Sequence, residues 1–254
     1  MLKWFSNKKK PVPQPIPKNC MEVDFTTDGL GVRGKNLSFL SDQQFIKAWG
    51  ESVRLNEEGW SKTGFGVPDV RWRAHVCCWA ARHALTLDGD FVECGVHTGI
   101  FSLTVCHYVD FASLPRTFWL FDTFNGIPLS SVAPEEQHHA IELNNSLYFD
   151  VFDYAKRNFS PFPNAKLVQG VLPQSFEETK VDRIAYLSID LNGAKAERET
   201  IEAIWPRLTP GAIIIIDDYG FASHEPQYEM WNEFARLQGR MVLTMPTGQG
   251  VLIK

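Results

Sequence analysis

Two adjacent aspartates, Asp217 and Asp218, directly follow four consecutive isoleucines in the stretch AIIIIDDYG, residues 212–220. The isoleucines indicate the middle of a buried strand, and a buried carboxylate without a partner is energetically costly. Paired negative charge at such a strand end therefore needs a positive group beside it. Other apolar stretches also carry an acid at or near their ends, namely Glu93 in DFVEC, Asp122 after TFWLF and Asp190 after IAYLSI.

A glycine-containing turn follows the first of these acids. The stretch VECGVHTG has the form E-x-G-x-x-x-G, built from Glu93, Gly95 and Gly99, with His97 where a central glycine would stand. The fingerprint of dinucleotide-binding proteins is G-x-G-x-x-G, and an acid before it would repel a pyrophosphate. S-adenosylmethionine fits better, because it carries an ammonium, a sulfonium and ribose hydroxyls that Asp122 could bind. The alternative interpretation is structural: a tight turn and a capped helix.

The alternation of apolar and amphipathic segments predicts the elements that position these acids. From Asp90 onward it indicates an α/β fold, a mostly parallel sheet with helices on both faces. In such sheets ligands bind beyond the carboxyl ends of the strands, where all five acids are expected. We expect strands at residues 90–96, 117–122, 165–170, 184–190 and 211–217, then closing segments at 239–245 and 250–254. Helices are expected at 98–109, 146–159, 195–208 and 227–238.

The chain divides into three parts. Residues 1–18 are rich in proline and lysine and are predicted to be a disordered tail. Residues 19–88 form an N-terminal extension with helices at 41–55 and 70–85, a loop at 57–69 and no assignment for 19–37. Residues 89–254 form the core, in a single globular domain with the extension. The loop from Thr123 to about Leu143 is long enough to be a lid over a substrate.

Composition disfavours several classes of protein. The net charge of −5 and the pI of about 5.8 argue against a nucleic-acid partner. No run of 18 apolar residues predicts a transmembrane helix, and the start of the chain lacks the features of a signal peptide. We expect a solvated tail there; the alternative is weak membrane contact through Trp4, Phe5 and Lys8–Lys10. The five cysteines lack paired spacing, which indicates reduced core residues and a cytoplasmic protein. Homo-oligomerisation stays open.

Five motifs in order resemble the macrocin O-methyltransferase family over roughly residues 70–254: DFVECGVHTGIFS, WLFDTFNGIP, VQGVLPQSF, LSIDLNGAKAERETIEAIWPRLTPGAIIIIDDYG and MPTGQGVLIK. The resemblance implies a Rossmann-like class I fold, S-adenosylmethionine as cofactor and O-methylation of a sugar, a glycan or a glycosylated small molecule. It implies that Asp190, Asp217 and Asp218 bind a divalent cation, commonly Mg²⁺, whose preferred ligands are oxygens. The expected cofactor-binding residues are Glu93, Gly95, His97, Gly99, Asp122, Thr123 and Gly170.

One position departs from the family pattern. Many members carry a second aspartate two residues after the first, where this chain has Asn192. Asn192 then positions the substrate while another base takes the proton, or the chain has lost activity. The best replacement base is His224, and His138 and His139 are weaker candidates. Two further functions stay open: a non-catalytic glycan-binding relative and an NAD-dependent Rossmann-fold sugar enzyme.

Overall fold

A seven-stranded sheet forms the centre of the computed structural model, which describes residues 23–134 and 136–254. The strand order is β5-β4-β3-β6-β7-β9-β8, and β9 runs antiparallel to β7 and β8 whereas the other pairs are parallel. The mostly parallel α/β fold is therefore confirmed. The strands are β3 (Asp90–Cys94), β4 (Phe118–Asp122), β5 (Ala165–Gln169), β6 (Ile184–Ile189), β7 (Leu208–Ile216), β8 (Leu243–Thr244) and β9 (Gly250–Ile253).

The central strands are covered on both faces, which explains their continuous apolar sequences. Every residue of β6 is buried, and so are the last five residues of β7. Ile213–Ile216 pair in register with Tyr186–Ile189, so the aspartates that follow the two strands emerge side by side. The register of these apolar runs thus fixes where the acids lie.

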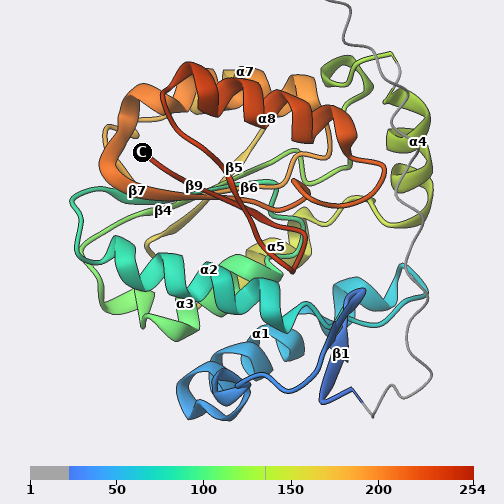
Figure 1. Cartoon of the computed structure of the whole chain (residues 1–254), viewed down its shortest axis with the longest axis vertical. Helices are drawn as coiled ribbons and strands as arrows, with labels where there is room; N and C mark the ends of the chain where they lie inside the picture. The colour runs from blue at the N-terminus through green and yellow to red at the C-terminus, as the bar shows by residue number, and fades with distance from the viewer. Residues whose placement is uncertain (1–22, 135) are drawn as a thin grey trace, which may run out of the picture.

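Helices form two layers around the sheet (Figure 1). One face is covered by α2 (Arg71–Ala84), α3 (Ile100–Tyr108) and α5 (Phe152–Phe159), and α1 (Gln43–Ser61) packs against α3 on the side away from the sheet. The other face is covered by α7 (Ala194–Ile204) and α8 (Glu225–Leu237), with the short α6 (Gln174–Glu177). Asp42 caps α1 by accepting a hydrogen bond from Gln44 N at 2.9 Å, as the Ser-Asp start signal predicts.

Several predicted boundaries are wrong. The loop predicted from Glu57 begins only after Ser61, because buried Asn56 and Gly59 continue the inward-facing side of α1. The loop from Thr123 contains α4 (Gln137–Ser146), and the helix predicted at 146–159 begins at Phe152. The intervening segment leaves the helical path, and Val151 N donates to Phe124 O at 2.9 Å. The unassigned segment 19–37 holds a hairpin of β1 (Phe25–Thr27) and β2 (Leu30–Val32).

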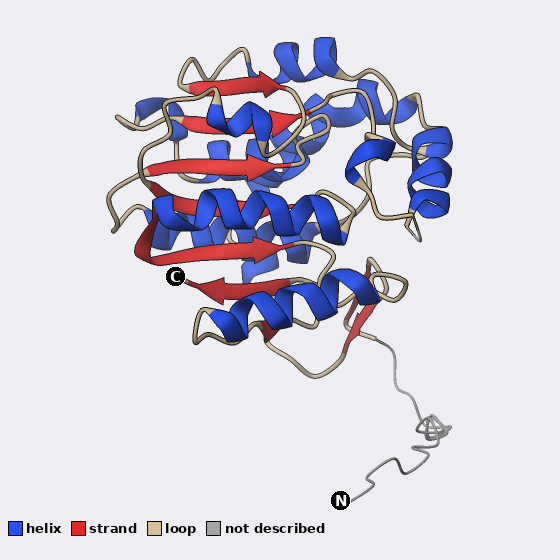
Figure 2. Cartoon of the chain, turned by 90° about the horizontal axis from the view of Figure 1, so that it is seen from above, coloured by secondary structure: helices blue, strands red, loops and turns tan. Residues whose placement is uncertain are grey.

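The carboxyl ends of the parallel strands point to one side of the molecule (Figure 2). The hairpin and α4 both lie on that side (Figures 1 and 2).

The predicted tail 1–18 and its proposed membrane contact fall outside the described residues. Cys77, Cys78, Cys94 and Cys106 are buried and unpaired, which confirms the prediction for these four. Among the described helices none is long and apolar enough to cross a membrane.

Candidate functional site

A cavity opens at the carboxyl edge of the sheet, and all five predicted acids line it. They come from the ends of four neighbouring strands, β4, β3, β6 and β7. Their placement at one edge follows from the parallel topology, as expected from the sequence. The cavity lining also contains most of the other predicted cofactor residues, namely Gly95, His97, Thr123 and Gly170.

The two glycines of the turn after β3 are required by close backbone packing. A Cβ on Gly95 would lie 1.8 Å from the carbonyl oxygen of Asp190, and Gly95 has φ of +86°. Gly99 directly precedes α3 as its N-cap residue with φ of +96°, and a Cβ there would lie 2.5 Å from the ring of Phe159. Only glycine fits both positions without strain, so this turn crosses directly over the end of β6.

Asp122 organises the same turn. Its Oδ2 accepts hydrogen bonds from Val96 N at 2.6 Å and His97 N at 2.7 Å, and its Oδ1 accepts one from Phe124 N at 2.7 Å. The sequence predicted a carboxylate free for ribose hydroxyls, whereas both oxygens already hold main-chain amides. Each carboxylate oxygen has two lone pairs, so Oδ2 is fully used and Oδ1 keeps one acceptor position for a ligand hydroxyl. Gly170 N in turn donates to Asp122 O at 2.9 Å.

Glu93 lies deep in the cavity with only 3% of its surface exposed. Burial, together with the negative charges of Asp217 and Asp122, raises the pKa of its carboxyl to about 8. Its Oε2 has no hydrogen-bond partner within the described part of the chain. A buried polar atom without a partner is costly in a folded protein, so this oxygen is suited to a polar or cationic ligand group.

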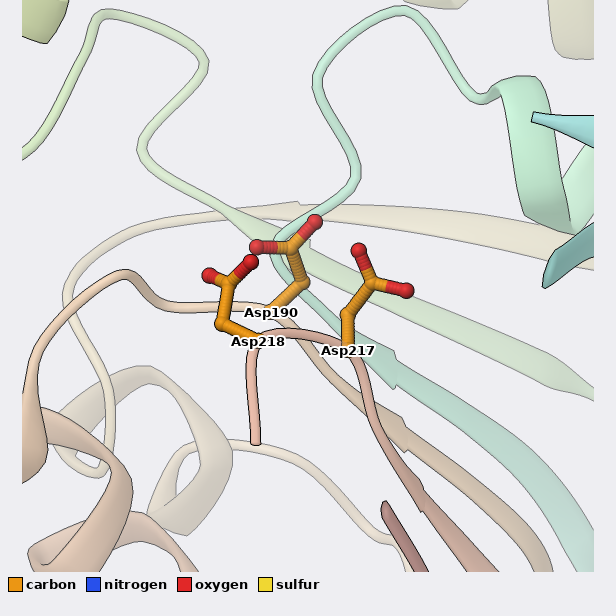
Figure 3. Close-up of side chains that lie close together, drawn as sticks. All are labelled: Asp190, Asp217 and Asp218. Atoms are coloured by element: carbon orange, nitrogen blue, oxygen red, sulfur yellow. The ribbon is translucent and has the colours of Figure 1, made fainter. Parts of the chain in front are cut away.

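Asp190, Asp217 and Asp218 form a carboxylate cluster (Figure 3). One oxygen from each lies within 4.8 Å of the others. The carboxylates of Asp190 and Asp218 face each other, and that of Asp217 stands beside them (Figure 3). The chain turns directly after β7, at residues 217–220, which brings both adjacent aspartates to one side as the sequence required. Burial and mutual repulsion raise the pKa of Asp190 and of Asp218 above the usual carboxyl range.

The donor set of this cluster fits a hard divalent cation. All its ligating atoms are carboxylate oxygens, which Mg²⁺ prefers in proteins. Both carboxylate oxygens of Asp217 already accept hydrogen bonds from the protein. Its Oδ2 accepts one from Arg73 Nη1 at 2.5 Å, and its Oδ1 accepts one from Gln249 Nε2 at 3.1 Å. Oδ2 of Asp218 has no partner among the described residues. Asp190 and Asp218 therefore offer the more accessible oxygens.

Asn192 is a direct neighbour of the cluster. It has φ of +55°, and its Nδ2 donates to Asp190 Oδ1 at 3.0 Å and to the hydroxyl of Tyr148 at 3.2 Å. Both Asn192 and Tyr148 line the cavity. The amide thus holds one carboxylate of the cluster and connects it to the segment that follows α4.

The predicted histidines occupy different places. His224 is not among the cavity-lining residues; its Nε2 lies 3.7 Å from Asp218 Oδ2, and burial lowers its pKa. His139 packs edge-on against it, with ring centroids 5.4 Å apart. His138 faces outward beside Glu142. His97 lies in the cavity wall next to Trp60, with ring centroids 5.2 Å apart.

Sequence reasoning missed Arg73, Gln249, Trp60 and Tyr148. Arg73 carried a signal that could have found it, since an arginine in the otherwise apolar helical stretch VRWRAHVCCWA must find a partner. Gln249 lies in the closing motif MPTGQGVLIK, whose family resemblance assigned it no role. Trp60 and Tyr148 fall in segments that were predicted with the wrong boundaries.

A protein-family model, Macrocin-O-methyltransferase (TylF), matches residues 46–243. This chain belongs to that family. Mycinamicin III 3''-O-methyltransferase of Micromonospora griseorubida is 30% identical over 144 residues, covering 52% of this chain and 55% of that protein. The chain spans about half the length of the curated relatives it matches.

Solved structures confirm the fold. The O-methyltransferase NovP superimposes with a TM-score of 0.66 at 19% identity, covering 86% of this chain and 99% of that chain. The methyltransferase PaMTH1 of Podospora anserina, solved with S-adenosylhomocysteine bound, gives a TM-score of 0.50 at 13% identity, covering 89% of this chain and 99% of that one. The resemblance stated from the motifs and the class I α/β fold are thereby confirmed.

Proposed function

We propose that this chain is an S-adenosylmethionine-dependent O-methyltransferase, assisted by a divalent metal, that acts on a hydroxyl of a sugar, a glycan or a glycosylated small molecule. One observation carries the proposal: a single cavity combines the glycine turn, the Asp122 carboxylate and the cluster of Asp190, Asp217 and Asp218. Family membership and relatives named as O-methyltransferases support it. The buried, unpaired cysteines support a reducing compartment such as the cytoplasm.

The cofactor half of the cavity consists of the ends of β3, β4 and β5. Asp122 accepts a ribose hydroxyl with the remaining lone pair of Oδ1, and Gly95 leaves the turn open to close approach. Glu93 Oε2 receives a cationic group, because it is buried and has no partner in the described residues. S-adenosylmethionine offers such a group and brings no phosphate to the acids.

The acceptor half lies over β6 and β7. A cation at the cluster would ease deprotonation of an acceptor hydroxyl and orient its oxygen. Asp190 and Asp218 present their carboxylate oxygens to the cavity, and Asn192 holds Asp190 in place by a hydrogen bond. With S-adenosylmethionine bound, an acceptor hydroxyl in line with the sulfonium methyl would form the O–C bond as the C–S bond breaks; S-adenosylhomocysteine would leave, and the hydroxyl proton would pass to a base. Through Asp218, His224 Nε2 can take that proton, and Tyr148 and Phe149, which line the cavity, exclude water.

Methyl transfer from labelled S-adenosylmethionine to a panel of sugars, glycosides and catechols tests the function. We expect turnover with Mg²⁺ that EDTA abolishes, while calorimetric binding of S-adenosylhomocysteine persists in EDTA. Asp190→Asn and Asp218→Asn should each be nearly inactive yet folded. Asp88→Asn is the matched control, since its side chain is 85% exposed and contacts only Arg183 among the ion pairs of the described chain.

Three results would contradict the proposal in different ways. Full activity in EDTA removes the metal from the mechanism. Binding of glycosides without turnover of any acceptor indicates a non-catalytic relative. Tight binding of NAD with no affinity for S-adenosylhomocysteine rejects the cofactor.

A further inference from the structure

Arg73 on α2 joins the carboxylate cluster to the N-terminal hairpin. Its Nη1 donates to Asp217 Oδ2 at 2.5 Å. Its other two nitrogens bind Asp28 in a fork, Nε to Oδ2 at 2.7 Å and Nη2 to Oδ1 at 3.1 Å. One guanidinium therefore shares its charge between a carboxylate of the cluster and a carboxylate of the hairpin.

The surroundings hold this guanidinium in place. The Arg73 side chain is only 15% exposed and lines the cavity. Its guanidinium carbon lies 5.6 Å from the ring centroid of Phe101 and 5.2 Å from that of Phe221, so it packs against aromatic rings. Burial disfavours the charged form, but the carboxylates of Asp217 and Asp28 outweigh it and raise the pKa of Arg73.

The hairpin presents Asp28 at a defined point. Asp28 and Gly29 have φ of +49° and +71°, the conformation of the tight turns that join two antiparallel strands. The hairpin is anchored beside α2: Thr27 Oγ1 donates to Asp69 O, and Phe25 packs on Trp72 with ring centroids 5.8 Å apart. Asp28 is thus held by the hairpin fold itself and reaches the cavity only through Arg73.

We propose that Arg73 is a positioning residue that competes with the metal ion for Asp217, and that the hairpin tunes this competition through Asp28. The inference rests on the proposed metal-assisted function. A positive charge beside a cation site weakens cation binding, and a carboxylate that draws on that charge restores it. The hairpin, which belongs to the extension outside the core, thereby sets the cation affinity of the site.

Calorimetry of the full chain with MgCl₂ alone, without cofactor, measures the effect. In Asp28→Asn the whole charge of Arg73 acts on Asp217, so Mg²⁺ binding should weaken on the order of tenfold. Arg73→Met removes the competing charge and should strengthen binding by a similar factor. Because Asp28 acts through Arg73, the double variant should bind Mg²⁺ as tightly as Arg73→Met. Arg73→Lys should stay nearer to wild type than Arg73→Met, because it keeps the charge.

Asp69→Asn is the matched control. It removes the same charge at a neighbouring site, but the Asp69 carboxylate pairs with Arg71, whereas that of Asp28 pairs with Arg73. Its Mg²⁺ affinity should stay within about twofold of wild type. The inference would be overturned if Asp28→Asn and Arg73→Met changed the Mg²⁺ affinity in the same direction. It would also be overturned if Asp28→Asn bound Mg²⁺ as tightly as Asp69→Asn.

Hydrogen exchange separates this inference from the proposed function. Asp217→Asn should speed amide exchange in β1 and β2, whereas Asp218→Asn, which makes no hydrogen bond to Arg73, should not. If wild type binds no Mg²⁺ but only Asp217→Asn loosens the hairpin, the metal proposal and the competition fail while the link through Arg73 stands. If neither variant, or both equally, loosens the hairpin, the link is overturned. This readout also covers the case in which Arg73→Met fails to fold.

Discussion

Replacing Asp122 with asparagine should damage both the fold and the cofactor site. Its carboxylate accepts three main-chain hydrogen bonds, from Val96, His97 and Phe124. An asparagine amide has one acceptor oxygen and one NH₂ group. Whichever way it is oriented, at least one main-chain N–H faces the NH₂ group and loses its acceptor.

The size of the loss follows from these contacts. Leaving a buried donor unsatisfied costs about 1–3 kcal/mol, and the remaining bonds lose the assistance of the charge. We expect the free energy of unfolding to fall by about 2–4 kcal/mol, which is roughly 4–16 °C in Tm for a chain of this size. Loss of a carboxylate–hydroxyl contact should also weaken S-adenosylhomocysteine binding by about 10- to 150-fold.

Urea denaturation without ligand and calorimetry with S-adenosylhomocysteine measure the two effects. Asp90→Asn is the matched control, because Asp90 accepts from Thr117 N and from Trp119 Nε1, both at 2.9 Å, at the opposite end of the sheet. The control should lose stability and keep its cofactor affinity. Unchanged stability of Asp122→Asn would refute the hydrogen-bond reasoning, and lost stability with unchanged affinity would remove Asp122 from the cofactor site.

Three further variants test neighbouring features. Gly95→Ala should not yield folded protein, because its Cβ would lie 1.8 Å from Asp190 O; a native circular-dichroism melt would contradict this. Glu197→Gln should lower the free energy of unfolding by about 1–3 kcal/mol. Glu197 accepts hydrogen bonds from Trp231 Nε1 at 2.6 Å and Gln227 Nε2 at 3.1 Å, and a glutamine cannot accept both fully. Equal urea midpoints of wild type and variant would contradict this expectation. Asn192→Asp should lower the Tm in EDTA and regain part of it with Mg²⁺, because a fourth carboxylate would replace the amide 3.0 Å from Asp190; identical shifts in wild type and variant would count against it.

The sheet and its acids could be predicted because the information is local. Runs such as Ile213–Ile216 are long, apolar and β-branched, and nothing but a doubly covered strand accommodates them. Parallel topology then brings strand ends together regardless of their separation in sequence. The cluster of Asp190, Asp217 and Asp218 follows from these two facts without knowledge of any side-chain contact.

The helix α4 within the loop after Thr123 could not be predicted in the same way. Within α4 only Ala140 is buried, so its sequence lacks the apolar stripe that marks a helix packed on a core. The aromatic residues Tyr148 and Phe149 suggested that a helix continued to Phe159, whereas they line the cavity from a non-helical segment. Tertiary contacts decided these boundaries, and local propensity did not.

The positive group that the paired aspartates require is in part the protein's own Arg73, 144 positions away in sequence. A local pattern could mark Arg73 as needing a partner, but it could not identify Asp217 as that partner. Burial and repulsion raise the pKa of Asp190 and Asp218. When all three carboxylates are ionised, the one guanidinium leaves the cluster two positive charges short of neutrality, even before Asp28 takes its share of Arg73. A second arginine would supply only one of the two missing charges, and it would fill the cavity and fix that charge permanently. A divalent cation closes it while leaving coordination positions for water and an acceptor oxygen. The guanidinium of Arg73 is a fixed positive charge on Asp217, whereas Asp190 and Asp218 keep the more accessible oxygens. This arrangement therefore suits a site in which a divalent cation binds those oxygens and also takes part in the chemistry.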